Sequence, residues 1–517
     1  MKTYEFFTLL MSLIFIVLNF SCVSKSNDRG KYFAKKTYSD TALPQFERDK
    51  DKIPIPILDG DPGWLDMYWK CWELALTKAK KPYPNSPFVS NYIDEAFNDN
   101  IFQWDTHFML MFWNYIFYLF PAIQSHDNFY CRQHENGYIC REIKEHTGED
   151  FYYDGKNNTT LTNTINPPLY TWVEYEYYKI SGDDSRFKLI IPVLEKYGEW
   201  INKNRINPNT THGLYRQTGL GSGMDNTPRS GSGWGCMSSQ MAMFYLYLGK
   251  ICECENEHIK AKKFYEKSKN IADKINQWMW NEEDGLYYDV DDNGEQVKVK
   301  TAASFWPMLA EICTQEQAKR MVKNLKDPKT FWRTIPFPTL SADHPHYNPK
   351  GHYWVGGVWA PTNYMIIKGL QKYGFQEFAA AASEKYLYGI YGVFKKTGTV
   401  WENYAPDSFE QGNIAKGDFV GWTGLGPISL LIENVMGIQL DALNNTIHWH
   451  LNRTDRHGIQ NLRFQDAVVS LVAERRSDKN AVTQMNIESN KDLKLKIYNR
   501  GQAKSFDIKQ GKNEIEF

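Results

Sequence analysis

The chain has 517 residues, of which 42% are hydrophobic and 23% are charged. This balance is typical of a folded globular protein, and it excludes a wholly disordered chain and a protein with many membrane spans. Lys and Arg number 60 against 61 Asp and Glu, so no excess of positive charge favours a nucleic acid as a partner. Aromatic residues make up 15% of the chain, and such an excess suits a site that stacks flat, weakly polar faces such as those of sugar rings.

The N-terminus has the features of an export signal. Residues 6–20 are almost wholly apolar, a run that suits a signal sequence and is short for a membrane span. Cys22 follows this run in a sequence that resembles a relaxed bacterial lipoprotein cleavage site, where the cysteine becomes the lipidated first residue. We predict a signal peptide with a lipoprotein box over residues 1–22, lipidation of Cys22, and a polar tether over residues 23–60.

This signal predicts an outer-membrane lipoprotein, on the periplasmic or the surface face of the membrane, with the lipid anchor as its only membrane contact. A plain secretory signal, which would give a secreted or periplasmic protein, is one alternative, and an uncleaved segment retained as a membrane anchor is the other.

The remaining cysteines do not form a pattern that indicates a disulfide framework, because they are scattered and odd in number. Cys252, Cys254 and His258 have a weak likeness to a set of metal ligands. Positions two apart on a helix point in different directions, however, so we interpret both cysteines as small buried hydrophobes. We predict no metal and no other cofactor.

From Trp64 to about residue 436 the apolar residues recur mostly at helical spacing, which predicts a mainly α fold. About twelve helices in six antiparallel pairs can close into a double ring, an (α/α)6 toroid, with the long loops around one mouth. An open superhelix of helix pairs is the alternative, but no fixed repeat is visible. The expected helices cover residues 65–80, 104–120, 185–204, 237–255, 257–280, 302–313, 315–325, 361–373, 376–391 and 423–436, a helix that opens at Pro167 and Pro168, and a short element near 127–141.

The pattern changes after Gly437. Short runs that alternate or are apolar are separated by Asn, Asp, Gly and Lys, which predicts short antiparallel strands. We therefore expect the toroid over residues 61–439 and a small β-sandwich-like domain over residues 440–517. The expected strands cover residues 446–450, 459–464, 467–473, 482–487, 493–498 and 504–508.

One candidate site segment runs from Gln103 to His107 at the start of a very apolar helix. A negative charge near a helix N-terminus is favourable in itself, which would explain Asp105 without any function. Trp104, two hydrogen-bonding side chains and an imidazole together also suit a site that holds a sugar ring.

A second segment, Gly219 to Gly235, contains six glycines and Asp225. A phosphate-binding loop is excluded, because Met224 stands where the third glycine of a dinucleotide fingerprint would be and no Gly-Lys-Ser/Thr occurs. A flexible turn with Asp225 as a turn residue remains an alternative. The glycines would also let the backbone approach a ligand closely.

A third segment, Thr399 to Asp407, places Glu402 between aromatic residues in another long loop between helices. A solvated Glu in a short extended segment is the alternative. Together with Asp225 it supplies two carboxylates in separate loops among Trp and Tyr. Hydrolysis of a glycosidic bond needs such a pair, one to protonate the leaving oxygen and one to attack or to activate water.

Six segments in one order resemble the (α/α)6-barrel glycoside hydrolases of the trehalase-like group, also called six-hairpin glycosidases. The likeness is greatest to glycoside hydrolase family 63 and its mannosylglycerate-hydrolase-like branch, and it covers about residues 60–440. The segments are Gln103–His107, Asn166–Leu169, Gly223–Arg229, Tyr353–Tyr364, Trp401–Tyr404 and Gly421–Gly424.

The resemblance implies hydrolysis of an α-glycoside with inversion, with Asp225 as general acid and Glu402 as general base. Family members often carry Arg where this chain has Val355, which weakens any transfer of substrate identity but not of mechanism. The resemblance places Gln103, Trp104, Asp105 and Arg229 at sugar-binding positions, and we add His107, Asn226, Trp354, Trp401, Tyr404 and Trp422 as further candidates.

The sequence thus predicts an inverting exo-α-glycosidase that acts on α-linked oligosaccharides of gluco or manno configuration. A carbohydrate-binding lipoprotein with an inactive site is one alternative, although it need not keep both carboxylates. A polysaccharide lyase on an α/α toroid is the other, although the near-zero net charge offers no cationic excess for uronates.

Replacement of the predicted lipidation site tests the export signal. Cys22→Ser should move the protein from the membrane fraction to the soluble fraction or block its maturation, because buried acyl chains contribute about 0.8 kcal/mol per CH₂. The activity of the folded body should not change. Wild-type protein that incorporates no labelled fatty acid, is soluble, and begins beyond Cys22 would instead establish a plain secretory signal.

Overall fold

The computed structural model describes residues 33, 35–95, 97–151 and 164–517. The predicted signal peptide, the lipidation site Cys22 and residues 23–32 of the predicted tether lie outside the described residues. In the part of the chain that is described, no helix is both long and apolar enough to cross a membrane.

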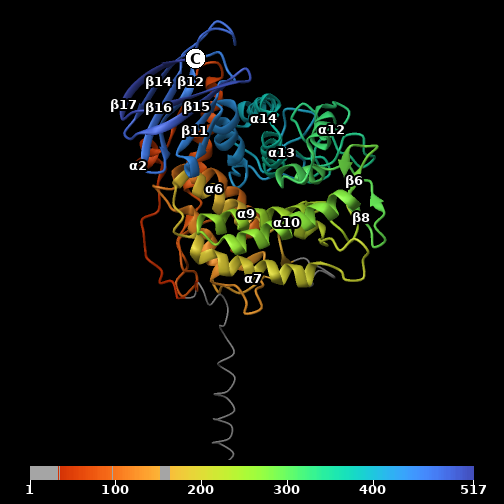
Figure 1. The fold of residues 1–517 in the computed structure, drawn as a ribbon. Helices are drawn as coiled ribbons and strands as arrows, with labels where there is room; N and C mark the ends of the chain where they lie inside the picture. The colour runs from red at the N-terminus through yellow and green to blue at the C-terminus, as the bar shows by residue number, and fades with distance from the viewer. Residues whose placement is uncertain (1–32, 34, 96, 152–163) are drawn as a thin grey trace, which may run out of the picture.

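The described chain is mainly helical and ends in a region of β-strands, as the sequence predicts (Figure 1). The last predicted helix is a 3₁₀ turn followed by a π-helix over Gly426–Val435. The longer α-helices are α3 (Pro62–Leu76), α4 (Gln103–Trp113), α6 (Tyr170–Ser181), α7 (Phe187–Arg205), α9 (Gly235–Cys254), α10 (His258–Trp278), α12 (Gln315–Lys326), α13 (Ala360–Lys372) and α14 (Gln376–Thr397).

Smaller elements lie in the connections between these helices. The short α-helices are α2 (Phe46–Asp49), α5 (Ser125–Tyr130), α8 (Gly219–Ser222) and α11 (Trp306–Leu309). The short strands pair two by two as β2 (Ala79–Lys80) with β3 (Tyr92–Ile93), β4 (Asn100–Phe102) with β5 (Glu142–Lys144), β6 (Trp280–Asn281) with β7 (Leu286–Tyr287), and β8 (Asp289–Val290) with β9 (Gln296–Val297).

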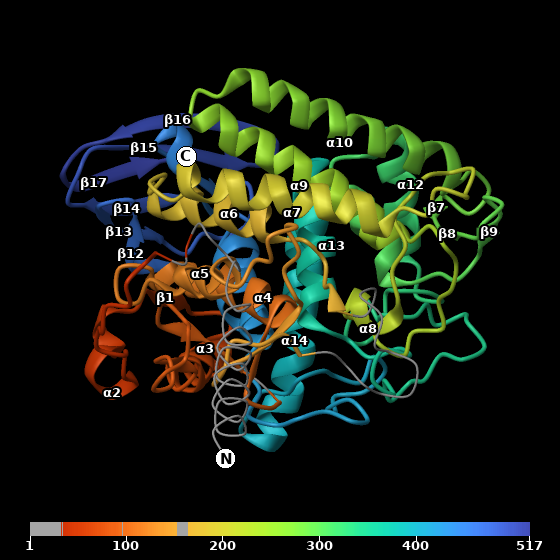
Figure 2. The same ribbon diagram turned by 90° about the horizontal axis from the view of Figure 1, so that it is seen from below.

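Helix packing follows the apolar pattern of each helix. In α10 the buried positions fall three or four residues apart, so one face is apolar and the other faces water. Its neighbour α9 is buried along nearly its whole length, because it packs against α10, α6 and α7 (Figures 1 and 2). The side chains that form the apolar face of α10 include Ala261, Phe264, Ile271 and Ile275.

Two sheets form the C-terminal region. A four-stranded sheet has the order β10-β11-β15-β16, and a five-stranded sheet has the order β1-β12-β13-β14-β17. All pairs are antiparallel except β11 with β15, which is parallel and corrects the expectation of antiparallel strands throughout. The strands are β10 (Ile438–Asp441), β11 (Thr446–His450), β12 (His457–Phe464), β13 (Ala467–Ala473), β14 (Gln484–Ser489), β15 (Leu493–Asn499), β16 (Gln502–Ile508) and β17 (Gly511–Glu516).

The segment just before α3 differs from the expected tether. Residues 46–49 form α2, and β1 (Ile55–Leu58) pairs with β12 at the edge of the five-stranded sheet. Pro56 lies within β1, and an edge strand tolerates proline because one side of it needs no amide donor. This part of residues 23–60 is therefore folded onto the C-terminal strands.

Candidate active site

A cavity of about 300 Å³ opens among loops that are far apart in the sequence. Its wall combines the start of α4, the start of β5, the loop around α8, and the loops near residues 353 and 422. The residues that line it are Phe97, Asn98, Phe102, Trp104, Asp105, Arg141, Glu142, Phe151, Asn166, Leu220, Gly223, Asp225, Tyr353, Trp354 and Trp422.

Asp225 reaches the cavity on the loop that follows α8. Thr218 caps α8, with its hydroxyl accepting the Gly221 N–H at 3.1 Å. Gly223 ends the helix with φ of +76°, and a Cβ there would lie 2.8 Å from the Trp104 ring. Only glycine fits both the backbone angle and the close approach, so Gly223 lets the Asp225 loop lie directly on Trp104.

The two residues that follow Asp225 fasten a second loop. The Asn226 side-chain oxygen accepts the Trp354 N–H at 2.9 Å, and its amide donates to the His352 carbonyl at 3.2 Å. The Thr227 hydroxyl donates to the Trp354 carbonyl at 3.1 Å. Asn226 therefore positions Trp354 and does not itself line the cavity.

Glu402 is held by its own loop beside these groups. Its backbone N–H donates to the Lys416 carbonyl at 2.9 Å, and its Oε2 accepts the Lys416 N–H at 3.1 Å. The Trp422 indole donates to the Glu402 carbonyl at 2.8 Å, which ties Glu402 to a residue of the cavity wall. Glu402 Oε1 is buried and has no hydrogen-bond partner within the described residues.

The acidic side chains near the cavity have unusual proton affinities. Burial raises the pKa of Asp225 to about 6, while the charge of Arg141 opposes the rise. Burial also raises the pKa of Glu402 to about 7, and the negative charge of Asp225 adds to that rise. Burial raises the pKa of Asp105 well above its usual value, and the charges of Asp94 and Glu402 raise it further. The carboxyls of Asp225 and Glu402 therefore both change protonation state near neutral pH.

Asp225 and Glu402 differ in their access to water. Asp225 is exposed to solvent through the cavity although protein surrounds the cavity, whereas Glu402 is only 4% exposed. The two carboxyls thus lie at different depths: Asp225 lines the cavity, and Glu402 is a buried residue that is not among those lining it.

Three indole rings supply flat apolar surface to the cavity. Trp354 is stacked on Trp359 with ring centroids 3.8 Å apart and an angle of 6°. Trp422 contacts Trp359 and Phe419, and Trp104 packs under Gly223. Such faces suit the apolar side of a sugar ring.

Tyr353 is a cavity residue that we did not predict as a site residue. Burial raises its pKa, and the charges of Asp225, Glu402 and Asp105 raise it further, so its hydroxyl lies near all three acidic groups. Tyr353 has φ of +64°, a conformation that L-residues rarely adopt and that is common at functional sites. Tyr353, like Asn166 and Gly223, falls inside a segment that carried the family resemblance, which was the signal that could have identified it.

Arg141 and Glu142 are further cavity residues without a signal in the sequence. They reach the cavity because β5, which begins at Glu142, pairs with β4, and β4 leads directly into α4. Arg141 Nη2 donates to Glu142 Oε2 at 3.0 Å. This pair adds charge to a wall in which seven of the fifteen residues are aromatic.

Six predicted sugar-binding residues do not line the cavity formed by the described residues. Gln103 donates to the Cys140 carbonyl at 2.9 Å inside the scaffold. His107 is buried on another face of α4 and contacts His126. Positions two apart on a helix point in different directions, so Asp105 and His107 cannot both face the same cavity. The six are Gln103, His107, Asn226, Arg229, Trp401 and Tyr404.

Arg229 and the Trp401 segment have structural partners instead. Arg229 forms a two-point ion pair with Asp289, both N···O distances being 2.9 Å, and lies over the Trp234 ring. The Trp401 indole donates to the Thr397 hydroxyl at 3.1 Å, and the Trp401 N–H donates to the buried Tyr404 hydroxyl at 3.1 Å. Arg229 fastens its loop to β8, and the Trp401 contacts hold the Glu402 loop against the end of α14.

Comparison with known proteins places the central part of the chain among glycoside hydrolases. Residues 236–423 match the model of the mannosylglycerate hydrolase MGH1-like glycoside hydrolase domain. The resemblance to family 63 and the trehalase-like enzymes is thereby confirmed for this part of the chain.

Two individual relatives and one solved structure are similar to parts of this chain. An uncharacterized protein of Borreliella burgdorferi is 27% identical over 369 residues, covering 69% of this chain and 76% of that protein. A mannosylglycerate hydrolase of Thermus thermophilus is 33% identical over 103 residues, an alignment that spans 20% of this chain and 24% of that enzyme. The crystal structure of a family 63 mannosylglycerate hydrolase from Thermus thermophilus with glucose matches with a TM-score of 0.56 at 17% identity, covering 70% of this chain and 99% of that chain. The last match establishes a common fold.

Replacement of Glu402 by Gln should stabilise the protein at alkaline pH. With a pKa of about 7 when folded against 4.5 as its ordinary value, Glu402 holds more protons in the folded state between those two pH values. The free energy of unfolding therefore falls as pH rises through this window. Glu402→Gln removes the effect and should gain about 3 kcal/mol at pH 8, since one pKa unit corresponds to about 1.4 kcal/mol.

Urea unfolding at pH 4.5 and at pH 8 measures this difference. The gain should vanish at the lower pH, and Glu266→Gln, at an exposed position on α10, should show no gain at either pH. A Glu402→Gln variant that is less stable than wild type at pH 8 would show that the ionised carboxylate is favourable in the folded state.

Proposed function

We propose that this protein is an inverting exo-α-glycosidase that acts on α-linked oligosaccharides of gluco or manno configuration and is built on an (α/α)6 toroid. The observation that carries the proposal is the pair Asp225 and Glu402, two carboxyls with raised pKa values, of which Asp225 lines the aromatic-rich cavity and Glu402 is bound to its wall residue Trp422. Hydrolysis of a glycoside needs one protonated and one ionised carboxyl at the same time, and pKa values in the neutral range allow a carboxyl to hold a proton at neutral pH.

The different depths of the two carboxyls support their roles. A leaving group must depart towards solvent, so the acid that protonates it belongs near the opening, where Asp225 lies. The buried Glu402 has one oxygen fixed by the Lys416 N–H and one without a partner among the described residues, which suits it to accept a proton from a water molecule. We therefore assign Asp225 as general acid and Glu402 as general base from their positions, although the pKa of Glu402 is the higher of the two.

The size and lining of the cavity support attack at a chain end. A volume of about 300 Å³ is at the small end of the range for ligand sites, so the cavity suits a terminal sugar better than the middle of a polymer. Trp104, Trp354 and Trp422 would contact the flat face of this sugar, and Asp105 would bind its hydroxyl groups.

We also propose that the enzyme is exported and held at the outer membrane through lipid on Cys22. The apolar run before Cys22 and the polar residues after it support this proposal.

Product analysis on a panel of α-linked disaccharides tests the function. We expect a free reducing sugar released first as the β-anomer, because water attacks the face opposite to the leaving group. Proton NMR during the first minutes distinguishes the anomers. An α-anomer formed first would contradict inversion, an unsaturated product would indicate a lyase, and binding of sugar without turnover would indicate an inactive binding protein.

Replacement of the proposed acid separates proton donation from binding. Asp225→Asn should lower kcat on a disaccharide by about 10²- to 10⁴-fold, because no proton reaches the leaving oxygen. The loss should be much smaller on a glycosyl fluoride, whose leaving group needs little protonation. Glu402→Gln is the matched variant and should lose activity on both substrates, since both need an activated water. Equal losses for Asp225→Asn on the two substrates would show that Asp225 has another role.

A further inference from the structure

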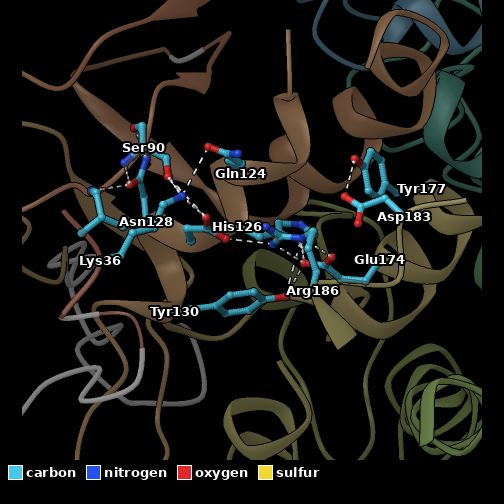
Figure 3. Close-up of polar contacts among 12 residues, drawn as sticks. Lys36, Ser90, Gln124, His126, Asn128, Tyr130, Glu174, Tyr177, Asp183 and Arg186 are labelled. Carbon is cyan, nitrogen blue, oxygen red and sulfur yellow. Dashed lines mark hydrogen bonds and ion pairs between the residues drawn. The ribbon is translucent and has the colours of Figure 1, made fainter. Parts of the chain in front are cut away.

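A chain of buried polar side chains leads from the N-terminal arm, which we define as residues 33 and 35–45, into the helical body (Figure 3). Lys36 Nζ lies 2.6 Å from Asp127 Oδ2. The other oxygen of Asp127 accepts from Arg186 at 2.8 Å, and Arg186 also holds both oxygens of Glu174 at 2.8 and 2.9 Å. The arm thus contributes one member of a four-charge cluster.

Lys36 makes this cluster neutral. The side chains of Asp127 and Glu174 are at most 1% exposed, so both negative charges are removed from water. Arg186 balances one of them, and Lys36, at the edge of the cluster, balances the other. An unbalanced buried charge is costly, so without Lys36 the cluster would favour movement of its members towards water.

The cluster continues into the helix that carries two cavity residues. His126 Nδ1 lies 3.1 Å from Glu174 Oε1, and His126 Nε2 lies 3.1 Å from His107 Nδ1. Because Glu174 accepts a hydrogen bond from Nδ1–H of His126, Nε2 of the neutral His126 accepts a hydrogen bond from His107 Nδ1–H, so the carboxylate fixes both rings. His107 belongs to α4, whose first turn carries Trp104 and Asp105 at the cavity.

Lys36 is also connected to the cavity wall through Ser90. Its ammonium donates to Ser90 Oγ at 2.6 Å. The Ser90 N–H donates to the Asn128 side-chain oxygen at 3.1 Å, so Ser90 is fixed to the same helix, α5, that carries Asp127. The chain continues from Ser90 through β3 to Phe97 and the cavity wall.

The arm is folded against the body around Lys36. Phe33 is 5% exposed, with its ring centroid 5.2 Å from that of Tyr130. Tyr38 donates to the Asn91 side chain at 2.8 Å, and the Asn91 amide donates to the Thr41 hydroxyl at 2.9 Å. These contacts hold Lys36 over Asp127 from both sides.

We propose that Lys36 is a positioning residue for the candidate active site: it completes the buried charge cluster and thereby holds α4 and the segment after Ser90, which form two walls of the cavity. The kinetic consequences of this proposal rest on the function proposed above, but its effect on α4 does not. The arm is then part of the catalytic scaffold and not only a spacer.

The test compares Lys36→Met with Lys81→Met in the full chain. Lys81 pairs with Asp40 of the same arm at 2.5 Å, but both side chains are exposed, so its loss should change little. Lys36→Met should increase hydrogen exchange of residues 103–113 about tenfold and lower kcat about tenfold, because a small displacement of site residues has a large effect on rate. Lys36→Arg should restore both, since it supplies the same charge.

Three outcomes decide the proposal. Folded Lys36→Met protein with wild-type kcat, KM and exchange of residues 103–113 would overturn it, as would a lower melting temperature with unchanged kinetics and exchange. If Lys36→Met does not fold, Lys36→Gln keeps a hydrogen-bond donor without the charge and is judged by the same two readouts. If wild-type protein hydrolyses no α-glycoside, the proposed function fails, and the exchange of α4 still decides the role of Lys36.

Discussion

Removal of water from the carboxyl groups at the cavity is the constraint on which the site depends. A carboxyl in water is ionised at neutral pH, and two ionised carboxyls cannot supply an acid and a base. Burial of Asp225 and Glu402 raises both pKa values into the neutral range, and the charge of one raises the pKa of the other. Hydration and mutual repulsion both oppose this arrangement, so a rigid frame must hold it.

Hydrogen bonds between loops provide this frame. Asn226 and Thr227 bind the loop of Trp354, and Trp422 binds the backbone of Glu402. Each of these hydrogen bonds joins a segment that carries Asp225 or Glu402 to a Trp of the cavity wall, either to its indole ring or to its backbone. The geometry between acid, base and aromatic surface is therefore set by these direct links, and the helices set where the loops begin.

The sequence predicted the helices well because each is a local pattern. The helix expected at residues 315–325 is α12, with a capping box at Thr314 and Gln317. The helix expected at 302–313 is broken into a 3₁₀ turn and α11, because Pro307 fits only the first turn of a helix. β1 was not predicted: its Pro56 lacks an amide donor and argues against a strand, and only a place at a sheet edge permits it.

The candidate site was predictable only where a residue's direction did not matter. Loop residues such as Asp225 were identified from composition and resemblance, since a glycine-rich loop can turn its side chain to the cavity. On α4, Trp104 and Asp105 line the cavity while Gln103 and His107 face the scaffold, a division that depends on how the helix is rotated. Arg141 could not be predicted from the sequence, because only the pairing of β4 with β5 brings it to the site.

Two kinds of buried carboxylate coexist in this molecule, and their partners distinguish them. Burial alone would raise the pKa of Glu174, but Arg186 lowers it to about 2, so Glu174 stays ionised and serves the scaffold. Glu402 is also buried, but it is held by a backbone N–H and by the more distant charge of Lys416, and its pKa rises to about 7. Burial thus leaves a carboxyl ionised where a guanidinium contacts it, as at Glu174. Where no guanidinium is in contact, as at Glu402, the carboxyl can bind and release a proton. Chemistry is expected at the second kind, which explains why the cations near the cavity are few while those around α5 are in direct contact with their carboxylates.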